Sequence, residues 1–475
     1  MSGINWKQVL PARCRPLGTV CALPILCLLA PASLALPWQA EEPPVDPALG
    51  ADDEGASMEL PELIEADYPI HGSLRARVRT RSNSDESDTD LFTTLRLDFG
   101  DVERYGYSGH VSAVGLADLD GTDDGEFSFY GVYDTYDSAV QGRLHLAYLD
   151  MPGHGNLEVL RVGRQQVYTT PEFAWFDGVR AEYGSRSKQE MVFGAYGGLP
   201  VRLFDSVDSG DMLGGLYAEA SPWDDARARL DYMRFEDKSL IGSGGNDLLN
   251  LGLRQGLMDG LDFTGSYSRL DSEDRDMELA LTSYGLVDDL VLRASWFELL
   301  EPQGTLANEL DPFTSSTFEL QPYRQGRFLA SKGFGESLVL EGGLDVRRVT
   351  EDMDVGEFNR DFERYFLRST FIDVADSGFD VTATVEALRG ETDIETWGLD
   401  FEKELSDRLE LAFGSYYSLD KYDLFLDAER DDVRSYHVDL SYAWRDDLSL
   451  DLDYVYEDDD LDNQHTIRIG MRWSF

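Results

Sequence analysis

Few residues in this chain have the type and spacing that covalent chemistry needs. His437, Asp439 and Ser441 occupy alternate positions, so they would share one face of an extended strand. A hydrolase built on this row would also need an oxyanion hole near the serine. The chain contains no Gly-x-Ser-x-Gly elbow and no His-Glu-x-x-His motif. A polar strand face explains the row better, and the sequence predicts neither an enzyme nor a cofactor.

Two acidic segments resemble parts of a calcium-binding loop. One contains Asp120, Thr122, Asp124 and Gly125, and the other contains Asp458, Asp460 and Asp462. Neither supplies the closing glutamate at the offset that a calcium loop requires. We therefore predict solvated loops that collect divalent ions loosely, and no dedicated metal site.

From Tyr68 onward, apolar and polar residues alternate with a period of two. The first segment places Leu74, Ala76 and Val78 on one face and four arginines on the other: Arg75, Arg77, Arg79 and Arg81. The segments 91–99, 437–444 and 448–456 alternate in the same way. Charges at this density would be too costly inside a soluble sandwich, but they cost little where the second face lines a water-filled lumen. The pattern predicts an all-β, antiparallel transmembrane β-barrel.

The turns are of two kinds, and together they give the strand number. Longer acidic segments alternate with short turns near Val102, Gly153, Ser187, Asp225, Asp259, Asp288, Gly335, Asp376, Asp407 and Asp446. Transmembrane barrels have short periplasmic turns and long outer loops. The ten short turns and the two chain ends predict 22 strands, within a range of about 16 to 24. Two stretches leave that number open, 127–136 and 318–328, because each could form an additional strand.

The last strand supports this prediction independently. One face carries Ile467, Ile469, Met471, Trp473 and Phe475, and the other carries Thr466, Arg468, Gly470, Arg472 and Ser474. This order resembles the β-signal of bacterial outer-membrane proteins, carried here by Gly470, Trp473 and Phe475. The resemblance implies an outer-membrane location and recognition by the barrel-assembly machinery.

The amino terminus has the features of a secretory signal. Basic residues precede an apolar stretch from Thr19 to Ala30, and Ser33-Leu34-Ala35 offers a small-x-small cleavage site. The apolar stretch is shorter than the ~20 residues of a membrane-spanning helix, although an uncleaved anchor is the alternative. All three cysteines lie within this segment, at Cys14, Cys21 and Cys27. We predict a signal peptide over 1–35, an acidic disordered periplasmic segment over 36–67, and the barrel over 68–475.

One internal segment resembles the strand–loop–strand of general bacterial porins. It reads Leu160-Arg161-Val162-Gly163-Arg164-Gln165, then Pro171-Glu172-Phe173, then Phe176-Asp177-Gly178-Val179. In those porins the loop folds into the pore as a constriction. The resemblance implies that Glu172 and Asp177 face a basic wall drawn from Arg75, Arg77, Arg79, Arg96, Arg161 and Arg164. Alternatively, Arg75 to Arg81 simply line the lumen and are neutralised by neighbouring carboxylates.

The charge of the chain limits its partners. Without the three basic residues of the signal, 38 Lys and Arg face 91 Asp and Glu, which leaves a charge of −53. This excludes nucleic acid as a partner and favours cations, although adaptation to a saline medium would explain the acidity equally well. We expect contacts with outer-membrane lipid, lipopolysaccharide and small polar or ionic solutes, and leave the oligomeric state open.

The predicted function is a porin-like channel for small polar solutes or ions, with a weak preference for cations. One alternative is a structural sheath around a periplasmic partner such as a multihaem electron carrier. Another is an exporter of an anionic polysaccharide, whose lumen should be lined by arginine.

Overall fold

The computed structural model of the chain describes residues 70–84, 86–121, 129, 131–136, 138–152, 156–167, 174–185, 190–201, 211–239, 242–284, 287, 289–301, 322–350, 361–390, 393–423, 428–459 and 463–475. The predicted signal peptide and acidic segment, residues 1–67, lie outside these residues. Within them, no helix is long and apolar enough to cross a bilayer.

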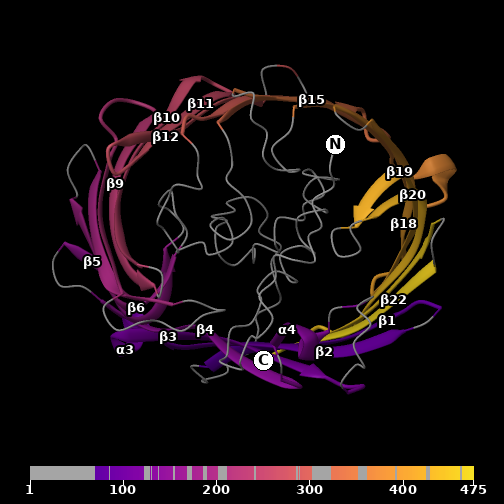
Figure 1. The fold of residues 1–475 in the computed structure, drawn as a ribbon, viewed down its shortest axis with the longest axis horizontal. Coiled ribbons are helices and arrows are strands. Elements are labelled where there is room, and N and C mark those ends of the chain that lie inside the picture. Colours follow the sequence, from indigo (N-terminus) through magenta and orange to yellow (C-terminus); the bar gives the residue numbers. More distant parts are fainter. Residues whose placement is uncertain are drawn as a thin grey trace, which may run out of the picture.

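The described residues form one antiparallel sheet of 22 strands, in which each strand pairs with the next and β22 pairs back with β1. Figure 1 shows the resulting ring, with β1 and β22 side by side. The predicted class and the preferred strand number are therefore confirmed. The strands are β1 (Ile70–Ser82), β2 (Ser87–Asp101), β3 (Tyr107–Asp118), β4 (Val140–Pro152), β5 (Leu157–Val167), β6 (Ala174–Ser185), β7 (Met191–Pro200), β8 (Met212–Ala220), β9 (Ala226–Ser239), β10 (Gly242–Met258), β11 (Leu261–Leu270), β12 (Glu273–Tyr284), β13 (Leu290–Leu299), β14 (Tyr323–Phe334), β15 (Leu338–Val349), β16 (Phe362–Phe371), β17 (Asp380–Gly390), β18 (Ile394–Ser406), β19 (Leu409–Asp423), β20 (Ala428–Arg445), β21 (Leu448–Asp458) and β22 (Asn463–Ser474).

Between the strands, the described residues contain three short helical turns: α3 (Val102–Tyr105), α4 (Val132–Tyr136) and η4 (Val374–Asp376). Helix α4 lies in the first stretch that left the strand number open, so part of that stretch is helical and adds no strand. In the second such stretch, the described residues from Tyr323 onward belong to β14.

The first strand, β1, begins at the same edge of the barrel at which the last strand, β22, ends. All ten predicted short turns connect strands at that edge. In five of them the residue before the new strand adopts a left-handed conformation, as at Gly260 (φ 75°) and Asp289 (φ 53°). Glycine reaches this conformation freely, and aspartate tolerates it better than most residues do. The recurring acid-Gly-Leu and acid-acid-Leu sequences therefore serve one purpose: each supplies, just before the new strand, a residue that tolerates a left-handed backbone conformation. We refer to this edge as the periplasmic edge and to the opposite one as the extracellular edge.

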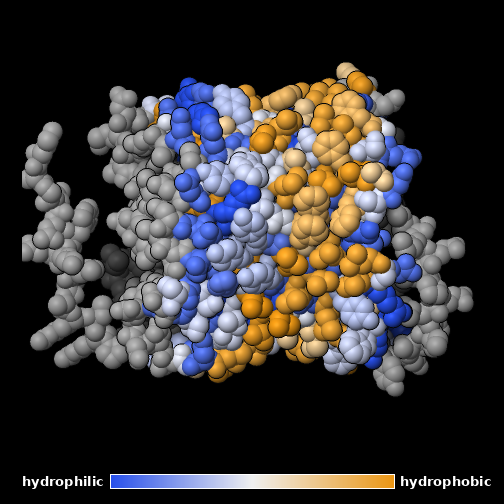
Figure 2. All heavy atoms as spheres, turned by 90° about the vertical axis from the view of Figure 1, so that its right-hand side faces the viewer, coloured by the Kyte–Doolittle hydropathy of each residue, from blue (hydrophilic) through white to orange (hydrophobic). Residues whose placement is uncertain are grey.

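The outer face of the barrel carries exposed apolar side chains that a soluble protein would bury. Leu216 is 58% exposed, Ile469 57% and Leu251 54%. Figure 2, which views the side of the barrel around β18 to β22, shows apolar side chains gathered into a band across the outer surface, with hydrophilic surface on both sides. Aromatic pairs mark its borders, such as Tyr436–Tyr456 towards the extracellular edge and Tyr442–Trp444 towards the periplasmic edge. A lipid-facing band between aromatic girdles is typical of transmembrane barrels.

The inner face is not polar throughout. On β5 to β11, a cluster of apolar side chains faces inward and is almost fully buried. In these strands apolar residues stand on both faces, as in Met212-Leu213 and Leu248-Leu249, so the alternation that marks the other strands is weak. The cluster comprises Val167, Phe176, Tyr196, Leu213, Tyr217, Met233, Phe235, Leu248 and Leu270.

Candidate functional site

The inner wall of the barrel gathers charged side chains from strands far apart in the sequence, and it is the candidate functional site. Residues directly opposite one another on neighbouring strands point to the same face, so the strand register fixes which side chains line the lumen. Arg75, for example, stands opposite Thr94 of β2 and Arg472 of β22. The same register carries the inner face around all 22 strands.

The seam, defined as the pairing of β22 with β1, carries three of the six arginines of the predicted basic wall, and a fourth, Arg96, lies next to it on β2. Arg75, Arg77, Arg79 and Arg96 all lie on the inner face, as predicted for a basic wall. Arg79 donates a 2.6 Å hydrogen bond to Asp90, which is fully buried. Arg81 binds Asp88 at the same distance. Carboxylates of β2 thus neutralise the extracellular end of this row.

The loop between β3 and β4 packs against these ion pairs from inside the barrel. The backbone N–H of Val132, at the start of α4, donates a 2.9 Å hydrogen bond to the Asp90 carboxylate. The Phe129 ring lies 5.3 Å from the Arg81 guanidinium. Figure 1 shows α4 on the inner side of the ring, beside β2. Burial raises the pKa of Tyr136 in this helix, against the opposing effect of Arg143. Sequence reasoning missed this inward-folded loop.

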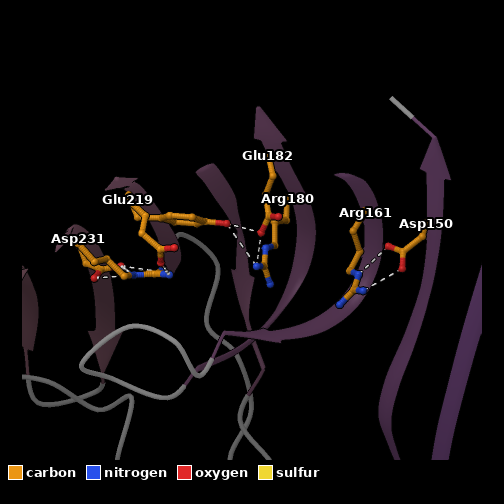
Figure 3. Close-up of polar contacts among 8 residues, drawn as sticks. Asp150, Arg161, Arg180, Glu182, Glu219 and Asp231 are labelled. Carbon is orange, nitrogen blue, oxygen red and sulfur yellow. Dashed lines mark hydrogen bonds and ion pairs between the residues drawn. The ribbon is translucent and has the colours of Figure 1, made fainter. Parts of the chain in front are cut away.

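A second set of inner charges, which we call the lumen ladder, runs across β4 to β9 (Figure 3). Arg161 forms two hydrogen bonds with Asp150, of 2.7 and 2.8 Å. The bidentate contact is the strongest geometry available to an arginine and a carboxylate. Hydrogen bonds and ion pairs also join the remaining members of the ladder to one another. These members are Arg180, Glu182, Tyr217, Glu219, Arg229 and Asp231.

A third set, on β14 to β17, is more deeply buried. Asp345 accepts hydrogen bonds from Gln325 at 2.8 Å and from Arg327 at 3.0 Å. Arg364, only 1% exposed, forms a bidentate pair with Glu386 at 2.6 and 2.7 Å. Paired charges of this kind set the electrostatics of the wall while leaving little net charge on it.

One stretch of the inner wall is acidic. Near the periplasmic edge, Asp380 stands directly opposite Glu402, and Glu404 stands opposite Glu410. Like charges facing one another across strands are destabilising unless water or cations screen them. This acidic patch, formed by these four residues, would attract cations to the periplasmic mouth.

The structure corrects the predicted position of Asp177 and Arg164. Both lie on the outer face, where Arg164 binds Asp177 through two hydrogen bonds of 2.8 Å. The reason is the strand period: Arg161 and Arg164 are three positions apart on one strand, so they point to opposite faces. Arg161 faces the lumen, and Asp177 cannot face the basic wall. Glu172 lies outside the described residues, between β5 and β6 as predicted.

The possible catalytic row divides among three separate contacts. His437, Asp439 and Ser441 all face the lumen, but each interacts with a neighbouring strand rather than with the others. His437 lies 3.3 Å from Asp400, Asp439 stands opposite Asp453, and the Ser441 hydroxyl donates to Asp451 at 3.2 Å. This arrangement contains no hydroxyl activated by an imidazole.

Of the two acidic segments, only Asp120 and Asp458 belong to the described residues. The Asp118 carboxylate accepts the backbone N–H groups of Asp120 and Gly121. Among the residues that the structure describes, no group of three or more metal-binding side chains converges.

The residues of the suspected assembly signal lie at the seam. Phe475 exchanges two backbone hydrogen bonds with Gly72, of 2.7 and 2.9 Å, and its ring packs against Trp473. Gly470 faces the lumen opposite Arg77. The last residues therefore help to close the barrel, which is a role separate from the predicted recognition by the assembly machinery.

No protein-family model matches this chain, and neither does any curated protein sequence. Solved structures do match. The siderophore receptor PirA from Pseudomonas aeruginosa aligns over 86% of this chain and 81% of its own, with a TM-score of 0.53 and 12% identity. OccAB3 from Acinetobacter baumannii aligns over 86% and 99%, with a TM-score of 0.43 and 12% identity. The outer-membrane protein OpdK from P. aeruginosa aligns over 86% and 99%, at 0.39 and 11%.

At these identities the similarity shows the fold alone, and it rests on the match to PirA. The chain has the fold of a 22-stranded outer-membrane barrel, and this fold fits the predicted outer-membrane location.

Proposed function

We propose that this protein is an outer-membrane channel that passes small polar solutes or ions and weakly prefers cations. The observation that carries the proposal is the division of the barrel into two faces. The outer face exposes an apolar band, whereas the inner face carries ion-paired charges around most of its circumference. An inner wall of this composition suits contact with water and dissolved solutes.

The structure also suggests what would determine selectivity. The acidic patch at the periplasmic edge favours cations, as does the overall charge of the chain. The arginines at the seam act in the opposite sense. Because paired charges dominate the lumen ladder, we expect the acidic patch and the loops to give a weak net cation preference.

The test is single-channel conductance in planar bilayers, followed by the reversal potential under a tenfold salt gradient. Wild type should conduct and should be cation-selective at ~0.1 M salt, where the Debye length is ~10 Å, and less so at ~1 M, where it is ~3 Å. Glu404→Gln should weaken the cation preference. The matched control is Asp177→Asn, which removes the same charge from the outer face and should leave the reversal potential unchanged. A folded barrel that does not conduct would refute the channel.

A plugged receptor is a second candidate, because 22-stranded outer-membrane transporters have plugged lumens and PirA is a siderophore receptor. Under this alternative, wild type would hardly conduct and a variant lacking residues 36–67 would conduct strongly. Of the alternatives drawn from the sequence, the seam arginines favour the exporter of an anionic polysaccharide. An anion-selective reversal potential at low salt would place that exporter first.

A further inference from the structure

Arginines oppose arginines directly at the seam. Arg75 stands opposite Arg472, and Arg79 stands opposite Arg468. Like charges at directly opposed positions destabilise a sheet. The pairing is therefore unfavourable for the barrel unless something with negative charge lies against it.

Carboxylates of the described residues neutralise only part of this arrangement. Arg79 has Asp90, but none of the described residues forms a hydrogen bond or a salt bridge with the guanidinium groups of four others. The Nε of one of them, Arg77, is buried and has no hydrogen-bond partner. These four are Arg75, Arg77, Arg468 and Arg472. By contrast, Arg161 and Arg364 each have a bidentate carboxylate partner.

The four unpaired arginines surround a position of the wall that has no side chain of its own. This position is Gly470, which is buried between Arg468 and Arg472 on β22 and stands directly opposite Arg77. A Cβ built at Gly470 would meet the carboxylate of Asp451 first, at 3.3 Å, so an anion held by these arginines would lie on the lumen side of Gly470 rather than against it. Arg77 is close enough to repel both Arg75 and Arg468. We call Gly470 and these four arginines the seam niche.

Two aspartates of β21 also lie near the niche. Asp451 stands opposite Gly470, and Asp453 stands opposite Arg468. Asp451 and Asp453 attract Arg75, and Asp453 attracts Arg468, but neither aspartate is within salt-bridge distance. Asp451 instead accepts the Ser441 hydroxyl, and Asp453 faces Asp439. Asp439 of β20 also attracts Arg468. Four guanidinium groups against these three carboxylates leave the niche positively charged.

We propose that the seam niche binds a small oxyanion, the carboxylate or phosphate of a solute inside the barrel. A guanidinium group presents a planar fork of N–H donors that matches the oxygens of either group. An oxyanion on the lumen side of Gly470 would face Arg77 and the two flanking arginines of β22. It would also relieve the repulsion across the seam. The inference goes beyond the proposed channel function, because it assigns a local anion site to the seam while the acidic patch and the loops set the overall cation preference.

Binding is measured on the full-length, folded barrel in detergent micelles by isothermal titration calorimetry, so it does not depend on conduction. Inorganic phosphate and succinate are titrated separately, which distinguishes the two anion classes. Wild type should bind at least one of them, and Arg77→Gln should weaken that binding tenfold or more. The control Arg161→Gln makes the same charge change at an arginine with its own carboxylate and should alter binding less than twofold.

Three results would overturn the proposal. They are no binding of either anion to wild type, unchanged binding to Arg77→Gln, and equal weakening by Arg161→Gln, which would indicate only the general charge of the lumen. Heat-modifiability on gels confirms that each variant is folded. Should Arg77→Gln not fold, Arg75→Gln serves in its place with the same expected loss. A barrel that binds an oxyanion but does not conduct would refute the channel and leave the niche standing.

Discussion

The division of the barrel into two faces can be tested with two adjacent residues of β10. Leu251 faces outward between Leu249 and Leu253 and stands opposite Leu230 of β9. The preceding residue, Asn250, faces the lumen opposite Asp231. An arginine at Leu251 would enter the apolar band, whereas an arginine at Asn250 would enter the charged inner wall.

The depth of Leu251 follows from the strand geometry. On the extracellular side, the apolar part of β10 ends at Asp247, which Arg234 binds at 2.9 Å. On the periplasmic side, it ends at the exposed Leu257 near the turn. The ten residue-to-residue steps from Asp247 to Leu257 extend about 34 Å along the strand, or about 24 Å across a membrane at a tilt of ~45°. This agrees with an apolar band of ~25 Å. Leu251 lies four residues from Asp247 and thus about 10 Å deep, close to the midplane.

Leu251→Arg should therefore destabilise the folded barrel by about 2–4 kcal/mol, the cost of an arginine near the bilayer midplane. Asn250→Arg should change the free energy of unfolding by less than about 1 kcal/mol, because water and Asp231 are within its reach. The assay is denaturant titration in lipid vesicles, followed by tryptophan fluorescence. Equal destabilisation by both variants, or a smaller effect at Leu251 than at Asn250, would mean that the register of β10 is wrong.

Three further predictions concern closure, the inner loop and the buried ion pair. Deleting Phe475 removes the two backbone hydrogen bonds to Gly72 at the end of the seam, together with the terminal aromatic of the predicted assembly signal. It should abolish assembly, so normal amounts of heat-modifiable barrel in the outer membrane would contradict this role. Asp90→Ala removes the acceptor that holds α4 and should raise single-channel conductance, while an unchanged conductance would mean that the loop does not narrow the lumen. Glu386→Ala leaves the buried Arg364 without its partner and should cost about 3–5 kcal/mol in vesicle titrations. The control Glu363→Ala breaks an exposed pair and should cost less than about 1 kcal/mol, and a similar loss in both variants would argue against burial as the cause.

The sequence by itself determined the class of the fold and the position of every short turn, and it indicated 22 as the preferred strand number within a range of about 16 to 24. A strand between lipid and water must alternate, and a short hairpin needs residues that tolerate a left-handed backbone, so both features are local and visible in the chain. The final strand was equally informative, because its apolar face and its terminal Phe475 are consecutive in sequence.

Only the tertiary structure decided which charges meet. Arg75 and Arg472 are almost four hundred positions apart, and their opposition exists only because β22 closes onto β1. The inward fold of α4 depends on Asp90, more than forty residues earlier in the chain. Alternation alone could have placed Asp177 and Arg164 outside, but the resemblance to a porin constriction gave the opposite prediction. Register across strands, rather than composition, determines which arginine has a carboxylate and which is left to bind a solute.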